Sequence, residues 1–158
     1  MRCEIRLLRP EMLARFGMPG YQSAMAAGID LVACLERPLV LYPQAPAILV
    51  PTGIAIHMAE PSVAAMIYPR SGLAHRKGLV LGNGVAVIDA DYQGEIMVSV
   101  WNRNPPSETE TVTVHPGDRI AQMVFVPILR PEFAIVSGFS SASDRGTGGF
   151  GSTGVAAA

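Results

Sequence analysis

Short apolar stretches recur along the chain, and each is bounded by proline, glycine, asparagine or aspartate. Valine and isoleucine dominate them, turn residues recur roughly every 8–12 positions, and helical periodicity is weak. The stretches are Ala33–Leu35, Leu39–Tyr42, Ile48–Pro51, Gly53–Met58, Ala64–Tyr68, Leu79–Leu81, Val85–Ile88, Ile96–Trp101, Thr111–Val114, Arg119–Pro127 and Ala134–Val136. This pattern predicts an all-β sandwich or barrel.

Helices are expected at only two places. Ser62–Ala65 and Ser71–Lys77 each begin with a serine, which can cap the first turn of a helix. With no break in composition to mark a linker, residues 1–137 are interpreted as a single β domain. Beyond them the chain becomes rich in serine, glycine, aspartate and threonine, so residues 138–158 are predicted to be a flexible C-terminal arm.

The clearest local feature is a predicted hairpin. Its arms are expected over residues 84–89 and 95–100, with the turn between them centred on Tyr92. That turn would pair Val87 with Met97 across the two strands.

Composition raises the question of what the chain buries. Of its 158 residues, 49% are hydrophobic and only 16% are charged, which suggests either a membrane protein or a subunit that covers surface with copies of itself. Residues 38–59 carry no charge, but four prolines would break a spanning helix there. Residues 1–10 lack the apolar core of a signal peptide. We therefore expect a cytoplasmic protein without membrane contact.

Charge and cysteine content exclude other classes. The formal net charge is −1 and no basic run is present, which disfavours nucleic-acid binding, although a small polyanion needs only a few local donors. Cys3 and Cys34 are too few for a disulfide scaffold and lack metal-binding spacing, so free thiols are expected.

Several polar residues interrupt the apolar pattern and could carry chemistry. Asp30 lies between apolar residues. It could be an ordinary carboxylate at a strand edge or turn, or it could be a ligand of a metal ion or water. Arg70 and Ser71 lie at the break between a predicted strand and a predicted helix. They could form an ordinary turn, or they could bind an anion. Gln122 lies in a long apolar run and must find hydrogen-bond partners.

Two further candidates belong to the predicted hairpin. Asp89 ends its first arm, where it could be a turn residue or could orient and deprotonate a water molecule. Asn83 lies between glycines, where it could form a turn or read an amide edge through its own donor and acceptor.

The glycine-rich segment 145–154 contains G-x-G-x-x-G, but no strand precedes it and no helix can follow, so a dinucleotide site is excluded. A P-loop is excluded because Ser152 stands where lysine is required. What remains is a low-complexity tail or a phosphate-wrapping one, in which Arg145 clamps a phosphate and Phe150 stacks on a base.

Five of these segments, taken in order, resemble the motifs of the trimeric deoxyuridine triphosphate nucleotidohydrolase (dUTPase) family. The segments are residues 27–31, 69–74, 82–95, 117–122 and 145–154. The resemblance implies a jelly-roll-like β-barrel that forms a homotrimer with active sites between subunits. It also implies the reaction, which is hydrolysis of dUTP to dUMP and pyrophosphate.

The resemblance further implies roles for residues around the hairpin. Asn83, with backbone groups near Val87, Ile88 and Met97, would read uracil. Tyr92 would lie beneath the deoxyribose and exclude a 2′-hydroxyl by collision.

Catalysis is implied at Asp89, which would activate the water that attacks the α-phosphorus. Mg²⁺ would be carried by the phosphates and would contact Asp30 and Gln122 through water. The substrate-binding groups implied in addition are Arg70, Ser71, Gly72, Gln122, Arg145, Phe150, Gly151 and Ser152. The last four belong to the arm, which would close over bound nucleotide.

Two alternatives stay open. A dCTP deaminase, or a bifunctional deaminase–dUTPase of the same fold, would carry a catalytic glutamate and a different hairpin motif. A nucleotide-binding sensor would keep the fold without turnover. Substrate range and the product released distinguish all three.

Overall fold

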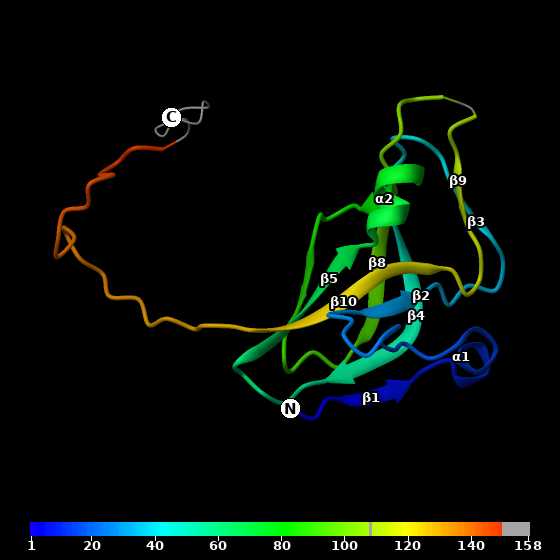
Figure 1. Ribbon diagram of the computed structural model, residues 1–158, viewed down its shortest axis with the longest axis horizontal. Coiled ribbons are helices and arrows are strands. Elements are labelled where there is room, and N and C mark those ends of the chain that lie inside the picture. Colours follow the sequence, from blue (N-terminus) through cyan, green and yellow to red (C-terminus); the bar gives the residue numbers. More distant parts are fainter. Residues whose placement is uncertain (108, 150–158) are drawn as a thin grey trace.

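The computed structural model describes residues 1–107 and 109–149 (Figure 1). Strands dominate this part of the chain, so the all-β prediction is confirmed. The strands are β1 (Glu4–Leu7), β2 (Ile29–Val32), β3 (Leu39–Leu41), β4 (Ile48–His57), β5 (Val63–Pro69), β6 (Leu79–Leu81), β7 (Ala86–Ile88), β8 (Glu95–Asn102), β9 (Val112–Val114) and β10 (Arg119–Pro127). The helices are α1 (Pro10–Phe16) and α2 (Ser71–Lys77).

The strands form two four-stranded sheets and a smaller pair. One sheet has the order β1-β4-β8-β6, the second has the order β2-β10-β5-β7, and β3 pairs with β9. Every strand pair is antiparallel. Within the described residues the sheets remain separate and do not close into one barrel.

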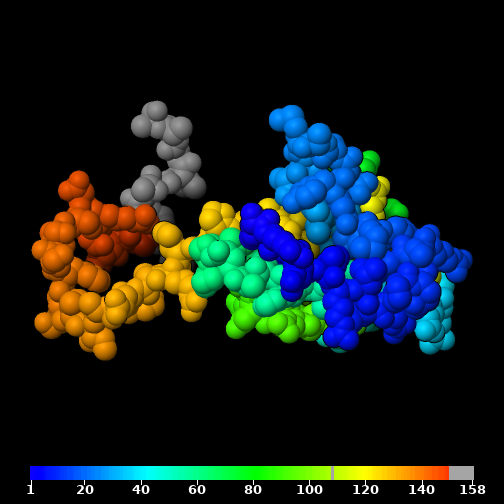
Figure 2. Space-filling model, turned by 90° about the horizontal axis from the view of Figure 1, so that it is seen from below, coloured from blue at the N-terminus to red at the C-terminus, as the bar shows by residue number. Residues whose placement is uncertain are grey.

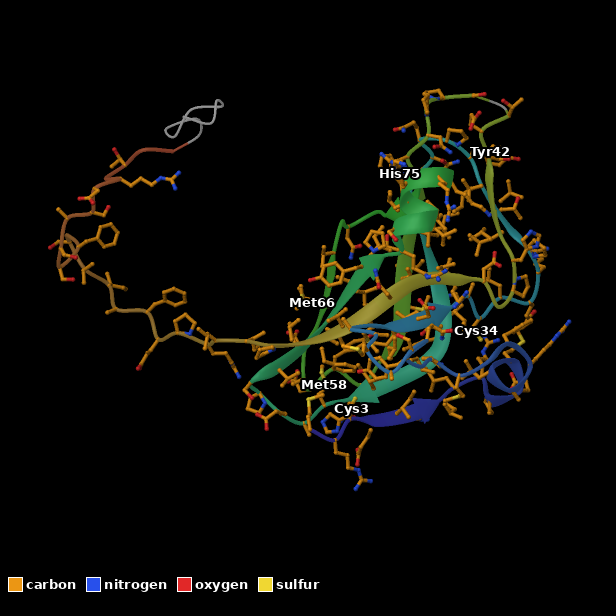
Figure 3. The ribbon with its side chains drawn as sticks, in the orientation of Figure 1. Cys3, Cys34, Tyr42, Met58, Met66 and His75 are labelled. Atoms are coloured by element: carbon orange, nitrogen blue, oxygen red, sulfur yellow. The ribbon has the colours of Figure 1, made fainter. Side chains whose placement is uncertain are left out.

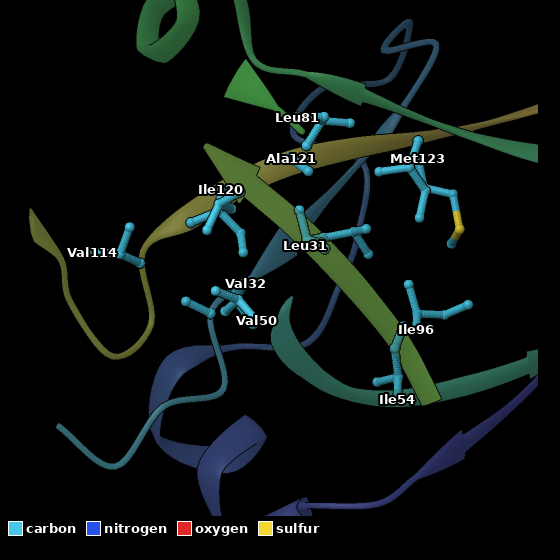
Figure 4. Packing of buried hydrophobic residues seen from close by; sticks show 14 of the residues in the cluster. Leu31, Val32, Val50, Ile54, Leu81, Ile96, Val114, Ile120, Ala121 and Met123 are labelled. Atoms are coloured by element: carbon cyan, nitrogen blue, oxygen red, sulfur yellow. The ribbon is translucent and has the colours of Figure 1, made fainter. Parts of the chain in front are cut away.

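The core lies between the two larger sheets (Figure 4). Burial alternates along β8, where Ile96, Val98 and Val100 are buried and the residues between them are half-exposed. Leu31 on β2 and Met123 on β10 meet them from the second sheet. The inner face of β8 therefore follows the period of two expected of a strand with one buried face.

The predicted hairpin is wrong. β7 pairs with β5, where Val87 lies opposite Met66, whereas β8 pairs with β4 and β6, and Met97 lies opposite Pro51. The two arms thus enter different sheets, and Val87 does not pair with Met97. Alternation specifies which face of a strand is buried, but it does not specify which strand lies beside it.

One of the two predicted helices is confirmed. α2 spans Ser71–Lys77 as expected, but Ser62–Ala65 is wrong because β5 begins at Val63 and pairs along β10. The Ser62 hydroxyl donates to Glu60 Oε1 at 2.7 Å instead of capping a helix. Long-range pairing of a Val- and Ala-rich segment overrides the local capping signal.

Other local expectations also change. Ala33–Leu35 lies beyond the end of β2, and Ala134–Val136 forms no strand. Neither β1 nor α1 was predicted, because charged residues mask the apolar alternation of β1 and α1 has no side-chain cap. Pro10 fits the first helical turn of α1, where its missing N–H costs no hydrogen bond.

The chain leaves the sheets after β10. Residues 128–149 contain no helix or strand and project away from the two sheets (Figures 1 and 2). The Ile128 N–H still donates to the Ser62 carbonyl at 2.8 Å. The arm boundary near residue 137 stays a prediction. No helix in the described ranges is long and apolar enough to cross a membrane.

Candidate active site

A buried carboxylate anchors the first group of polar residues. Asp30, on β2, is only 9% exposed. Its Oδ1 lies 3.0 Å from Arg70 Nε, and its Oδ2 lies 3.1 Å from Arg119 Nη1. An unpaired carboxylate at this depth would be costly, so the two guanidinium groups account for its burial.

Hydrogen bonds connect Asp30 and its two arginines to further polar residues. Arg70 Nη1 donates to the Arg119 carbonyl at 3.1 Å, and Arg119 Nη1 donates to Gln22 Oε1 at 3.0 Å. Gln122 lies opposite Asp30 in the pairing of β10 with β2, and its Nε2 donates to the Pro69 carbonyl at 3.0 Å. Because the bond to Pro69 uses the amide nitrogen, the amide oxygen of Gln122 can still accept a hydrogen bond.

These residues open into a cleft of about 750 Å³. The cleft brings together Arg70, Ser71 and Gly72, which were predicted to bind phosphate, with Asp30 and Gln122, which were predicted to contact Mg²⁺ through water. We call it the basic cleft. Its full lining is Gln22, Ala26, Ala27, Gly28, Asp30, Arg70, Ser71, Gly72, Leu73, Arg76, Lys77 and Gln122. Guanidinium groups beside a hydroxyl and a glycine backbone suit a polyanion.

Asp89 lies in a second cleft, of about 560 Å³, which shares no lining residue with the basic cleft. We call it the acidic cleft, because Glu60, Asp89 and Asp91 line it. The loop that carries Asp89 is fixed to the end of β4, since the Ala90 carbonyl accepts from the Met58 and Ala59 N–H groups at 3.2 Å. One chain alone therefore does not place Asp89 beside Arg70.

Three side chains have pKa values shifted from their usual range. The hydroxyl and backbone N–H of Ser62 donate to Glu60 and lower the pKa of this exposed carboxyl. Burial raises the pKa of the Cys3 and Cys34 thiols. Both are free cysteines, as predicted, and neither lines either cleft. Cys3 lies just before β1, and Cys34 lies inside the fold (Figure 3).

The residues expected around uracil are divided between the two sheets. Val87 and Ile88 lie on β7, and Met97 lies on β8. Asn83 lies in the exposed turn between β6 and β7. Tyr92 is 43% exposed, and its hydroxyl donates to the Glu95 carbonyl at 3.0 Å.

Tyr92 is held in a defined position by its neighbours. Its ring lies against Gly94, where any Cβ would collide with it. The hydroxyl bond to Glu95 fixes the other end of the ring. Gly94 therefore allows the aromatic side chain to fold back along the loop after Asp89.

Arg145 forms a turn of its own in the arm. Its Nε donates to the Gly148 carbonyl at 2.8 Å, and the Gly148 N–H donates back to the Arg145 carbonyl at 3.0 Å. The other arm residues predicted for the site, Phe150, Gly151 and Ser152, lie outside the described residues.

Comparison with known proteins adds an independent observation. The family model described as dUTPase matches residues 14–154. A deoxyuridine 5′-triphosphate nucleotidohydrolase of Enterobacter sp. (strain 638) is 52% identical over 153 residues, which cover 97% of each chain. The chain belongs to the dUTPase family. The resemblance seen in the five motifs is confirmed.

Solved structures of dUTPases have the same fold. A mutant dUTPase of Staphylococcus bacteriophage 80alpha, described with bound dUpNHpp, is 26% identical and has a TM-score of 0.85, covering 98% of this chain and 99% of that one. The dUTPase of phage phi11 of S. aureus, described with a coordinated structural Mg(II) ion, is 24% identical. Its TM-score is 0.75, and the alignment covers 89% of this chain and 100% of that one.

Sequence reasoning missed several residues that the structure places in or beside the basic cleft. Arg119 and Gln22 support Asp30, and Arg76 and Lys77 line the basic cleft. Arg119 and Asp30 are 89 positions apart, and only the pairing of β10 with β2 brings them together. Arg76 and Lys77 follow Ser71 on a predicted helix, so helical spacing was a usable signal for them.

Proposed function

We propose that this chain hydrolyses dUTP to dUMP and pyrophosphate in active sites assembled from more than one copy of the chain. The observation that carries the proposal is the basic cleft, where the Asp30-anchored Arg70 lies beside Ser71, Gly72 and Gln122. Membership of the dUTPase family, and a nucleotidohydrolase 52% identical, support dUTP as the substrate.

Asp89 acts as the general base. Its carboxylate takes a proton from a water molecule whose oxygen attacks the α-phosphorus. The bond from that phosphorus to the oxygen bridging to the β-phosphate breaks, and pyrophosphate leaves with the electron pair. Arg70 and the backbone at Gly72 stabilise negative charge that spreads over the phosphate oxygens in the transition state.

Discrimination of the nucleoside is assigned to the segment from Asn83 to Met97. Asn83 and backbone groups near Val87, Ile88 and Met97 read the uracil edge. The Tyr92 ring lies beneath the deoxyribose, where a 2′-hydroxyl would collide with it. The contacts of Tyr92 with Gly94 and Glu95 support this role, because exclusion by size requires a ring that cannot move aside.

The residues of the basic cleft fit a Mg²⁺ ion that arrives with the triphosphate. Within residues 1–107 and 109–149, no group of three or more histidine, cysteine or carboxylate side chains could hold a metal by itself. Asp30 accepts from two arginines, but each carboxylate oxygen keeps a lone pair for a water molecule, and the Gln122 amide bonds Pro69 through its nitrogen, which leaves its oxygen to accept. When bound, the ion would neutralise phosphate charge, with Asp30 and Gln122 holding its water shell.

The assembly is assigned as a homotrimer of jelly-roll-like β-barrels, with the C-terminal arm closing each site. Two observations support contact between copies. The basic and acidic clefts share no lining residue, and Asp89 follows the β7 residue that pairs with Ala65, whereas Arg70 follows Pro69 at the opposite end of β5, so we assign their meeting to a subunit boundary. In addition, Leu129, Phe133 and Phe139 are at least 90% exposed in a single chain.

Residues 138–158 are assigned as the arm, with Arg145 and Ser152 on phosphates and Phe150 and Gly151 on the nucleoside. The turn around Arg145 supports a preformed guanidinium clamp. The expected location is the cytoplasm, and neither nucleic acid nor membrane is expected as a partner.

Purified protein tests the activity with dUTP, dCTP, dTTP and UTP in the presence of Mg²⁺, measured as pyrophosphate release. We expect turnover of dUTP alone, and a loss of about 100-fold or more in Asp89→Asn. Glu60→Gln is the matched control, because it removes one carboxylate charge from the same cleft without removing the base. Ammonia release from dCTP would instead support the deaminase. Binding of dUTP without turnover would support the sensor.

A further inference from the structure

Arg76 is a basic residue of α2 that the proposed mechanism has not used. Its guanidinium folds back along the helix over Gly72, with Nη2 3.0 Å from the position that a Cβ on Gly72 would occupy. Arg76 and Lys77 line the basic cleft together with Arg70 and Ser71. The side chain therefore points toward the proposed phosphate groups rather than away from the helix.

The charge of Arg76 has no counter-ion in the part of the chain that the structure describes. The ion pairs found there are Arg9–Glu36, His57–Glu4, Arg70–Asp30 and Arg119–Asp30. Asp30 is the only carboxylate among the residues that line the basic cleft, and it is already shared by two arginines. Arg76 and Lys77 also line a neighbouring cavity that contains Glu110 and Asp118, but no ion pair joins either basic side chain to a carboxylate among the described residues.

The Arg76 guanidinium, which has no ion-pair partner among the described residues and lies in the same cleft as Arg70, suits an anion larger than one phosphate. Arg70 is committed to Asp30 through Nε and to the Arg119 carbonyl through Nη1, so part of its donor set is already used. The donors of Arg76 are not used in this way, since no hydrogen bond from its side chain is found among the described residues. A planar guanidinium can clamp two phosphate oxygens at once.

We infer that Arg76 is a further phosphate-binding residue of this site and that it contacts the β- and γ-phosphates of the substrate. This inference rests on the proposed function. Arg76 lies one helical turn beyond Gly72 and lines the same cleft as Arg70 and Ser71, so it can contact a second or third phosphate when Arg70 and Ser71 contact the first. Its contact neutralises the phosphates that become the pyrophosphate leaving group.

Three variants test the inference. Arg76→Gln removes the charge, and Arg76→Lys keeps the charge but loses the bidentate fork. Arg37→Gln is the matched control, because it removes one exposed arginine charge from a residue that lines neither cleft. Thermal unfolding of all three variants checks that the fold is intact.

Steady-state kinetics with dUTP and Mg²⁺ give the first measurement. We expect Arg76→Gln to lower kcat/KM about tenfold, as for loss of one charge-assisted hydrogen bond. Arg76→Lys should recover part of the loss, and added salt should reduce the difference between wild type and Arg76→Gln. Arg37→Gln should match wild type.

Binding of inorganic triphosphate with Mg²⁺, measured by calorimetry, gives a second measurement that does not depend on turnover. We expect weaker binding in Arg76→Gln, whereas binding of deoxyuridine should be unchanged. If wild type hydrolyses dUTP and Arg76→Gln behaves as Arg37→Gln in both measurements, the inference is wrong. If wild type does not hydrolyse dUTP but triphosphate binding still depends on Arg76, the proposed function fails and the anion contact stands.

Discussion

Asp30 shows how one buried side chain can organise a charged site. Its two oxygens fix the guanidinium groups of Arg70 and Arg119 at 3.0 and 3.1 Å, and those arginines would otherwise repel each other. The carboxylate thereby holds Arg70 in one orientation at the rim of the basic cleft. We propose that its principal role is to position Arg70, the arginine assigned to phosphate binding, and that contact with metal-bound water would be secondary.

Removing the charge of Asp30 tests this positioning role. We expect Asp30→Asn to lower the free energy of unfolding by about 2–3 kcal/mol, because two arginines lose their shared counter-charge in a partly buried site. The KM for dUTP should also rise. Urea denaturation and steady-state kinetics measure the two effects.

The control for this prediction is Glu36→Gln. Glu36 pairs with Arg9 at 3.6 Å but is 83% exposed, so its loss should cost about 0.5 kcal/mol or less. Equal effects of the two substitutions would show that Asp30 is no more than an ordinary surface charge.

At the scale of elements, β4 is the strand on which the acidic cleft depends. Its register against β8 shifts between Pro51 and Ala55, and Gly53 lies in this irregular segment at φ +72°. The Gly53 N–H donates to Glu95 Oε1 at 2.9 Å, while the Glu95 carbonyl accepts from Tyr92. The irregularity in β4 is thus connected through Glu95 to the ring that would lie beneath the deoxyribose.

Substitution of Gly53 separates backbone strain from close packing. We expect Gly53→Ala to destabilise the fold by about 2–4 kcal/mol, because it adds a strained φ and a collision with the buried Cys34 sulfur. A Cβ at Gly53 would lie 2.8 Å from Cys34 Sγ. Denaturant unfolding measures the cost.

Gly84 provides the control, because it has the same φ of +72° and no atom lies within 4 Å of the position that a Cβ would occupy there. Gly84→Ala should therefore cost only the strain, about 1–2 kcal/mol. In a Cys34→Ala background the cost of Gly53→Ala should fall toward that of Gly84→Ala. If the cost is the same in both backgrounds, the sulfur contact does not limit the site.

For the molecule as a whole, local patterns predicted the strands but not their neighbours. The apolar stretch Ile96–Trp101 lies within β8 and the predicted helix Ser71–Lys77 is α2, although Arg70 and not a serine is its N-cap residue. The separation of β7 from β8 into different sheets, and the contact of Arg119 with Asp30, depend on pairing between distant segments. Such pairing leaves no local signal. The residues assigned to phosphate binding were therefore predicted through the family motifs, whereas Arg119, which pairs with Asp30, was not predicted.

The apolar stretch after β10 was predicted as a strand but does not form one, again because a strand depends on pairing with another segment. Ala134–Val136 has the composition of a strand, yet among residues 1–107 and 109–149 it pairs with no other strand, and Ile135 is fully exposed. A strand needs a neighbouring strand for its backbone hydrogen bonds and a surface for its side chains. Both can come from a second copy of the chain.

The proposed assembly predicts how this stretch responds to substitution. Wild type should sediment with about three times the mass of one chain, since closed homo-oligomers hide such surfaces. The double substitution Phe133→Ser and Ile135→Ser should shift the mass toward the single chain, because it removes apolar area that contact would bury. It should leave the far-ultraviolet circular dichroism of the β-sheets unchanged, since both side chains are at least 90% exposed within one chain.

Met25→Ser is the matched control. Met25 is 95% exposed but lies in the loop before β2, outside the stretch that follows β10. Its substitution should leave the mass and dUTP turnover unchanged, whereas the double variant should lose turnover together with assembly, because the basic and acidic clefts would no longer meet. A wild-type protein that sediments as a single chain while hydrolysing dUTP would contradict the shared site. Full turnover by a dissociated double variant would contradict it as well.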